Sequence, residues 1–359
     1  MIDPQALSDT LAGLGQPTFR SRQVYEALTR GLVTDFDQVT SLPRGLRREL
    51  AARLRPLTLE PRETRAASRG AARKTLFATG DGLPVEAVLL PAGRRTTVCV
   101  SSQVGCAVGC AFCASGAAGL RRDLTAEEMV DQVLHCAREL RPAGKQVTNV
   151  VFMGMGEPFL NYDETLRACR LLNDPHGFAL AARAISVSTA GVAPGIRRFA
   201  AESLQANLAV SLHAATDELR DRLVPLNRRY PLDALFSACA EYVAARRRKL
   251  LFEYVVLAGV NDGDGQVRAL VRRLRRPLYH LNLIAYNEAG GVFVRPRAPE
   301  LAALRDKLVQ AGVSCTLRRS AGGEIGAACG QLALRSLDEE REERQPDGRR
   351  LSSRRRPRA

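Results

Sequence analysis

The sequence predicts an α/β protein with a parallel sheet covered by helices and a small helical domain at the N-terminus. From residue 96 onward, short segments rich in apolar and β-branched residues alternate with longer amphipathic segments. This alternation is typical of repeated strand–helix units, which form either a partial barrel or a doubly wound sheet. With 359 residues and 45% hydrophobic content, the chain is long enough for one large core and a smaller domain.

The first part of the chain precedes these repeated units. Apolar residues recur at helical spacing in FRSRQVYEALTRG and LPRGLRRELAARL, with basic residues between them. We expect residues 1–60 to form a helical domain that either faces RNA or only packs against the core. Residues 61–91 predict a β-rich connecting segment, because strand-like runs flank a Gly-Asp-Gly turn there.

The repeated units are predicted to form a core domain over residues 92–335. Six strand-like segments lie at 96–101, 148–154, 184–189, 207–212, 250–257 and 279–285. Helical segments lie between them at 125–140, 163–173, 193–202, 232–248 and 265–276. Thr125 and Glu128 have the spacing of a capping box, which predicts that the first of these helices begins there.

Charge suggests a polyanionic partner. The formal net charge is +15, and residues 341–359 hold eight Arg and three acidic residues, so 8 − 3 = +5 lies there and about +10 elsewhere. Residues 336–359 lack apolar periodicity and predict a disordered basic tail. A basic body favours nucleic acid as partner, although Arg-rich chains without such a partner also occur.

No stretch of about 18 apolar residues is present, which predicts that the chain does not span a membrane. The start, MIDPQALSDTLAGLG, has no basic segment followed by an apolar one, so we expect a cytoplasmic protein. Nine cysteines in such a protein indicate thiols, metal ligands or catalysis rather than a framework of structural disulfides.

Three of these cysteines, Cys106, Cys110 and Cys113, have the spacing C-x3-C-x2-C in a Gly-containing loop. A structural zinc site needs four ligands, but the four His are isolated, and Cys99 lies within a predicted strand. Buried core thiols match such a loop poorly. Three thiolates can instead hold an iron–sulfur cubane and leave one iron open to a substrate or cofactor. The loop after the first strand of such a sheet lies at its ligand-binding edge, which favours the cluster.

This spacing, with Phe112 before the last cysteine, resembles the radical S-adenosylmethionine (SAM) superfamily. Within it, the chain resembles the RlmN/Cfr family of RNA adenine methyltransferases over about residues 10–333. The resembling segments are CVSSQVGC (99–106), CAFCASG (110–116), FMGMGEPFLN (152–161), STAGVAPGI (188–196), AVSLHA (209–214), EYVVLAGVND (253–262) and AACGQL (327–332). The resemblance implies a partial (βα)6 barrel and a 4Fe-4S cluster on the three cysteines, with SAM at the open iron.

The resemblance also implies roles for residues outside the cluster loop. Cys329 would carry a methyl group taken from one SAM, and a second SAM would supply the radical, so that two are used per turnover. Cys99 would resolve the protein–RNA adduct by forming a disulfide with Cys329, and Glu86 would be the general base. Residue types alone would make each Cys a core residue and Glu86 an outward-facing charge. The implied SAM contacts are Gly154, Gly156, Glu157, Ser188, Ser211, Leu212, His213 and Asn287.

The remaining cysteines, Cys136, Cys169, Cys239 and Cys315, are interpreted as core residues. The resemblance implies methylation of C2 of an adenosine in 23S rRNA, with tRNA as an additional substrate, a reductant such as flavodoxin or ferredoxin, and a monomeric enzyme. Two alternatives stay open. One is C8 methylation of the same adenosine, against which the GMGEP form argues. The other is a non-catalytic, zinc-stabilised RNA-binding protein.

Overall fold

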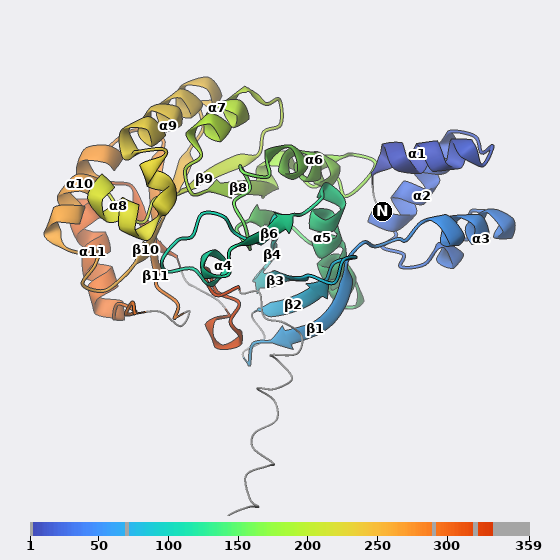
Figure 1. The fold of residues 1–359 in the computed structure, drawn as a ribbon, viewed down its shortest axis with the longest axis horizontal. Helices are drawn as coiled ribbons and strands as arrows, with labels where there is room; N and C mark the ends of the chain where they lie inside the picture. Colours follow the sequence, from blue (N-terminus) through green and yellow to red (C-terminus); the bar gives the residue numbers. More distant parts are fainter. Residues whose placement is uncertain (1–2, 69–71, 289–291, 319–321, 333–359) are drawn as a thin grey trace, which may run out of the picture.

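The computed structural model describes residues 3–68, 72–288, 292–318 and 322–332 (Figure 1). Its centre is a ten-stranded sheet with the order β1-β2-β3-β4-β7-β8-β9-β10-β11-β12. Neighbours from β4 onward in this order are parallel, whereas β1 to β4 pair in antiparallel fashion. Among the described strands the order does not close on itself, so the sheet is a partial barrel. The predicted fold class is confirmed.

The parallel strands are β4 (Arg95–Cys99), β7 (Asn149–Phe152), β8 (Ile185–Thr189), β9 (Asn207–Ser211), β10 (Leu250–Val256), β11 (Tyr279–Ala285) and β12 (Cys315–Arg318). The first six fall on the six predicted strand segments. Strand β12 adds a further parallel neighbour to β11, in register from Leu281 opposite Cys315. It therefore lies at one edge of the sheet.

The helices between the strands are α5 (Ala126–Leu140), α6 (Tyr162–Asn173), α7 (Ala193–Ala201), α8 (Asp217–Leu223), α9 (Leu232–Arg246), α10 (Asp264–Leu274) and α11 (Ala298–Gln310). The predicted capping box is confirmed, because the Thr125 side chain accepts from the Glu128 backbone N–H and the Glu128 carboxylate accepts from the Thr125 N–H. Helices and strands share one large apolar cluster, in which Leu134 and Ile196 from helices lie with Phe152 from β7.

The N-terminal helices α1 (Pro4–Gly13), α2 (Phe19–Thr29) and α3 (Arg44–Arg53) lie at one end of the molecule (Figure 1). Arg138 of α5 joins this region to the core, because its guanidinium donates to the carbonyls of Leu32 (2.9 Å) and Val33 (2.8 Å). Strands β1 (Glu60–Ala66), β2 (Arg73–Ala78) and β3 (Pro84–Ala92) extend the same sheet beyond β4.

A smaller hairpin forms the loop that follows β4. It consists of β5 (Gln103–Gly105) and β6 (Leu120–Asp123), with the short helix α4 (Ala114–Ala117) between them. The predicted basic tail at 336–359 lies outside the described residues. Within the part of the chain that the structure describes, no helix is long and apolar enough to cross a membrane.

Candidate active site

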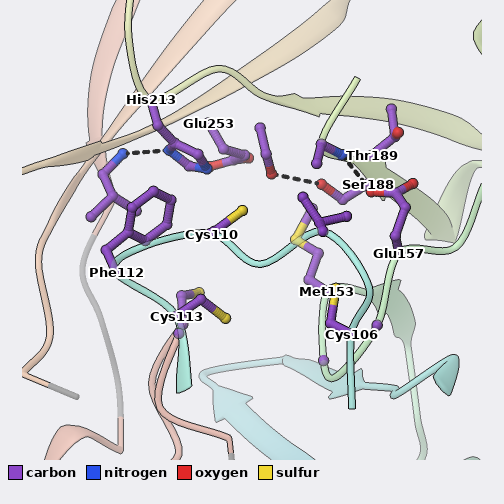
Figure 2. Close-up of a pocket in the computed structure, with 18 of the residues that line it drawn as sticks. Cys106, Cys110, Phe112, Cys113, Met153, Glu157, Ser188, Thr189, His213 and Glu253 are labelled. Carbon is purple, nitrogen blue, oxygen red and sulfur yellow. Dashed lines mark hydrogen bonds between the residues drawn. The ribbon is translucent and has the colours of Figure 1, made fainter. Parts of the chain in front are cut away.

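A cavity of about 150 Å³, partly open to solvent, lies at the carboxyl ends of the parallel strands. Figure 2 shows the three clustered cysteines along one side, with His213, Glu253, Ser188 and Thr189 along the other. Because each parallel strand ends at this edge, side chains far apart in the sequence meet there. The lining includes Cys106, Cys110, Cys113, Met153, Gly154, Gly156, Glu157, Ser188, Thr189, Ser211, His213, Glu253, Arg318 and Cys329.

The cysteine loop is held by its own backbone. The N–H of Cys106 donates to the carbonyl of Gly119 (3.1 Å), and Cys113 is the N-cap of α4. A Cβ at Gly116 would lie 2.9 Å from the backbone nitrogen of Cys110, so glycine is required where the loop folds back on itself. All three cysteines are half-buried free thiols that line the same cavity.

Burial controls the protonation of these thiols. It raises the pKa of Cys106 to about 12 and that of Cys110 well above its ordinary value. Such thiols stay protonated at neutral pH unless a metal displaces the proton, which is the usual behaviour of cysteine ligands. The thiols therefore fit a metal cluster better than they fit free nucleophiles.

The structure also bears on the zinc alternative. Among the described residues, no three His, Cys, Asp or Glu side chains lie close enough together to hold a single metal ion. In a cubane, each thiolate binds a different iron, so its ligands lie farther apart than the ligands of one ion. The three cysteines line one cavity without forming a single-ion site, which fits a 4Fe-4S cluster better than a tetrahedral zinc site.

The glycines after β7 have a packing role in addition to the expected contact with a ligand. They were expected to admit a ligand, and both do line the cavity. However, a Cβ at Gly154 would lie 2.7 Å from the Ser101 Oγ, and a Cβ at Gly156 would lie 2.6 Å from the Gln103 Cβ. Both positions therefore require glycine because the loop packs against the segment that follows β4.

Glu157 connects the ends of two strands. Its carboxylate accepts from the backbone N–H groups of Phe159 (3.0 Å) and Ala190 (2.6 Å), and burial raises its pKa to about 6. Its own N–H donates to the Gln103 Oε1 (2.8 Å). The carboxylate thus fixes the wall between β7 and β8 and borders the cavity at the same time.

The serines and His213 lie at the ends of β8 and β9. The Oγ atoms of Ser188 and Ser211 are 3.4 Å apart. The Nδ1 of His213 accepts from the Val255 N–H (3.0 Å), and burial lowers the pKa of His213 to about 3, so its ring is neutral. The ring meets Phe112 of the cysteine loop edge to face, with centroids 4.8 Å apart. His213 thus braces the cluster loop against β10.

Two further residues that the sequence interpretation did not single out line this cavity. Glu253 of β10 is buried, and Arg318 of β12 lies 3.4 Å from it, measured from Nη1 to Oε1. The Glu253 Oε2 is buried with no hydrogen-bond partner among the described residues. The signal for Glu253 was an acidic residue within the apolar strand LLFEYVV. No sequence signal pointed to Arg318, because only the order of the strands in the sheet brings this residue to the cavity.

Cys329 and Cys99 share a second cavity next to the first. Cys329 is exposed and lines both cavities, whereas Cys99 is buried at the end of β4 and lines only the second. Burial raises the pKa of Cys99 to about 12, and the surrounding walls also raise the pKa of Cys329, while Arg318 acts in the opposite direction on both. The expected disulfide between them is not present, because all nine cysteines are free. Both thiols are therefore protonated at neutral pH, and protonated thiols do not readily form a disulfide.

The loop that bears Cys329 is attached to the cluster loop. The Ala114 N–H donates to the Gly330 carbonyl (2.9 Å), and the Ser115 Oγ donates to the Leu332 carbonyl (2.5 Å). Asn287 approaches the Cys329 carbonyl with its Nδ2 at 3.5 Å. Asn287 and Leu212 are both buried and do not line the first cavity in the part of the chain that is described.

Glu86 is buried rather than outward-facing. Its carboxylate lies 2.6 Å from the Nζ of Lys74 on the neighbouring strand β2, and both side chains are at least nine-tenths buried. The Lys74 Nζ lies 3.5 Å from where a Cβ of Gly326 would be, three residues before Cys329. The ion pair thus borders the Cys329 loop, although Glu86 does not line either cavity within the described residues.

Comparisons with known proteins agree with this arrangement. The family model of the Radical SAM superfamily matches residues 100–271. The chain is 45% identical to the probable dual-specificity RNA methyltransferase RlmN of Chloroflexus aurantiacus, covering 92% of this chain and 90% of that protein. It is 43% identical to the dual-specificity RNA methyltransferase RlmN of Syntrophobacter fumaroxidans, covering 91% and 95%.

A solved structure agrees over the same length. The crystal structure of a radical SAM methyltransferase from Sphaerobacter thermophilus is 48% identical and superposes with a TM-score of 0.90. The match covers 92% of this chain and 98% of that one. The similarity therefore extends well beyond residues 100–271, which the family model matches.

Proposed function

Because this chain belongs to the RlmN family of dual-specificity radical SAM RNA methyltransferases, we propose that it methylates C2 of an adenosine in 23S rRNA. Transfer RNA is proposed as its second substrate. The observation that carries the proposal is the position of Cys329. Cys329 is the exposed residue among the nine cysteines, and it lines both the cavity of the three clustered cysteines and the cavity that contains Cys99.

The three clustered cysteines would hold a 4Fe-4S cluster, and the cavity beside them would bind SAM. When bound, these groups supply an adenosyl radical that can abstract hydrogen from an unreactive carbon. The cavity walls exclude water from most of the site, since the lining is largely apolar and Glu157, His213 and Glu253 are buried. Glu253 lines this cavity, and its buried Oε2 has no hydrogen-bond partner among the described residues.

Carbon C2 of adenine is not nucleophilic, so a side chain is needed to carry the methyl group to it. Cys329 would carry it as a thioether, after its thiol has lost a proton to become the attacking thiolate. Arg318 favours that thiolate, because its guanidinium acts against the rise in the pKa of Cys329. The hydrogen bonds from the Ala114 N–H to the Gly330 carbonyl and from Asn287 to the Cys329 carbonyl hold the carrier loop against the cluster loop.

Release of the RNA adduct and removal of the C2 proton are the two remaining steps, and we assign them to Cys99 and Glu86. Cys99 would attack the sulfur of Cys329 once the adduct has formed, so that an S–S bond forms as the S–C bond breaks. The carbon would leave with the electron pair and take up a proton to become the methyl group, so its reduction balances the oxidation of the two sulfurs. Both thiols line the second cavity, which supports this pairing. Glu86 would accept the C2 proton, and it must then separate from Lys74, because a carboxylate held 2.6 Å from an ammonium is a weak base.

The test is complementation of a strain that lacks this gene, with ribosomal RNA and tRNA digested and measured by mass spectrometry. The wild-type gene should restore 2-methyladenosine, and Cys329→Ala should not, although its iron content and SAM binding stay normal. Cys99→Ala should leave a protein–RNA adduct that survives denaturation. Cys315→Ala is the matched control, because that thiol lies on β12 and lines neither cavity.

Each outcome has a definite meaning. Restoration of 8-methyladenosine would keep the mechanism and change the target carbon. Restoration of 2-methyladenosine by Cys329→Ala would exclude the methyl-carrier role, and a free product at normal yield from Cys99→Ala would exclude the resolving role.

A further inference from the structure

Arg220 is a fully buried charged residue that the proposed mechanism does not use. It lies in α8, directly after β9, and its side chain is completely shielded from solvent. Its Nε donates to the Leu212 carbonyl (3.0 Å), and its Nη2 donates to the carbonyls of Ala190 (2.6 Å) and Ser211 (3.1 Å). Its Nη1 donates to the Asn227 Oδ1 (2.9 Å). Every one of these acceptors is neutral.

No carboxylate pairs directly with this guanidinium in the part of the chain that the structure describes. The nearest acidic partners are one layer away, because Asn227 uses its Nδ2 to hold the Oδ1 atoms of Asp217 (2.9 Å) and Asp221 (2.7 Å). Burying an ion without an opposite charge beside it is costly, and natural proteins do so chiefly where the charge has a use.

The guanidinium lies behind the part of the cavity wall that Ala190 and Ser211 form. Two of its acceptors, Ala190 and Ser211, line the same cavity as the clustered cysteines. The cysteine loop is hydrogen-bonded to the end of the same helix, since the Ala111 N–H donates to the Leu223 carbonyl (3.0 Å).

We propose that Arg220 is a fixed counter-charge that raises the reduction potential of the 4Fe-4S cluster held by Cys106, Cys110 and Cys113. The inference rests on the proposed function only in needing that cluster. Reduction adds one electron from an external donor to a group that is already anionic, with no bond made or broken. A nearby buried cation therefore stabilises the reduced form more than the oxidised form. The carboxylates of Asp217 and Asp221 are held one residue away through Asn227, so they reduce this effect without pairing directly with the guanidinium.

The competing explanation is that Arg220 only clamps carbonyl groups at the ends of β8 and β9. Lysine separates the two roles, because Arg220→Lys keeps the charge and loses the planar fork of donors. The neutral variants Arg220→Gln and Arg220→Met lose the charge, and glutamine keeps two amide donors. Arg222→Gln is the matched control, since Arg222 is exposed on the same helix.

The experiment is a redox titration of the anaerobically reconstituted proteins, with the reduced cluster followed by electron paramagnetic resonance. Iron content and circular dichroism are measured on each protein. At a fixed solution potential, we expect the ratio of reduced to oxidised cluster to fall on the order of tenfold in the Gln and Met variants. This fall corresponds to a decrease of about 59 mV in the reduction potential of a one-electron couple. The Lys variant and the Arg222→Gln control should stay close to wild type.

An unchanged potential in the neutral variants would overturn the inference, as would an equal shift in all three Arg220 variants, which would indicate the clamp alone. If the neutral variants fold but lose the cluster while the Lys variant keeps it, the counter-charge role is supported. Loss of the cluster from all three supports the clamp and overturns the inference. A wild-type chain that binds no iron would overturn both this inference and the proposed function, whereas the other failures leave methylation untouched.

Discussion

Replacing Gly156 by alanine should destabilise the protein by several kcal/mol. The residue has φ +101°, and a Cβ there would lie 2.6 Å from the Gln103 Cβ and 2.8 Å from its backbone nitrogen. Gln103 cannot move aside cheaply, because it accepts from the Glu157 N–H (2.8 Å) and donates to the Asp123 Oδ1 (2.6 Å). Backbone strain of about 1–3 kcal/mol and overpacking of about 1–3 kcal/mol together give roughly 2–6 kcal/mol.

The assay is urea unfolding of the reduced, cluster-free protein, which reports the free energy of unfolding from the midpoint and slope. The matched control is Gly265→Ala in the first turn of α10, where no atom lies within 4 Å of the added Cβ. That change should be neutral or stabilising by up to about 1 kcal/mol, since alanine favours helix. A Gly156→Ala protein within about 0.5 kcal/mol of wild type would refute the packing argument.

Two further predictions concern the effect of the Lys74–Glu86 ion pair and of the buried Glu157 on the free energy of unfolding. Lys74→Met leaves the buried Glu86 carboxylate without its ammonium partner and should cost about 3–5 kcal/mol in urea unfolding. Arg53→Met breaks an exposed ion pair and should cost less than about 1 kcal/mol, so equal losses would contradict the role of burial. Burial raises the pKa of Glu157 from 4.5 to about 6, so its contribution is fully present below pH 4.5 and is lost as the pH rises through 6. Wild type should therefore lose about 2 kcal/mol across that window relative to Glu157→Gln, and parallel stability curves would contradict the assignment.

The local signals in the sequence predicted the fold well. The six predicted strands coincide with β4 and β7 to β11 because apolar runs bounded by turns and helices are local patterns. Helix α8 was missed because its seven residues, DELRDRL, are too few to show a period. The pairing of β3 with β4, which joins residues 84–92 to the barrel sheet, is a tertiary contact that no local pattern encodes.

The candidate site likewise combines features that a local sequence pattern predicts with features that depend on tertiary contacts. The spacing of Cys106, Cys110 and Cys113 is local and predicted their common cavity. Glu253 and Arg318 are 65 positions apart in the chain and meet only because β10, β11 and β12 are neighbours in the sheet. Gly156 was identified by its motif, but its physical reason, the contact with Gln103, depends on how the loop after β7 meets the loop after β4.

The two arginines at the site differ in a way that suits two different tasks. Arg318 lies beside Cys99 and Cys329 and is paired with Glu253 at 3.4 Å, so its field on the thiols is reduced by the carboxylate. Arg220 donates only to neutral acceptors among the described residues, and Asp217 and Asp221 reach it only through Asn227, so its charge is less compensated than that of Arg318. Thiols that must gain and lose protons during turnover need a moderated field, because too strong a cation would hold them as thiolates. A cluster that must accept an electron is instead favoured by a positive charge that is not directly paired with a carboxylate. The same barrel end thus provides both environments, separated by the wall that Ala190 and Ser211 form.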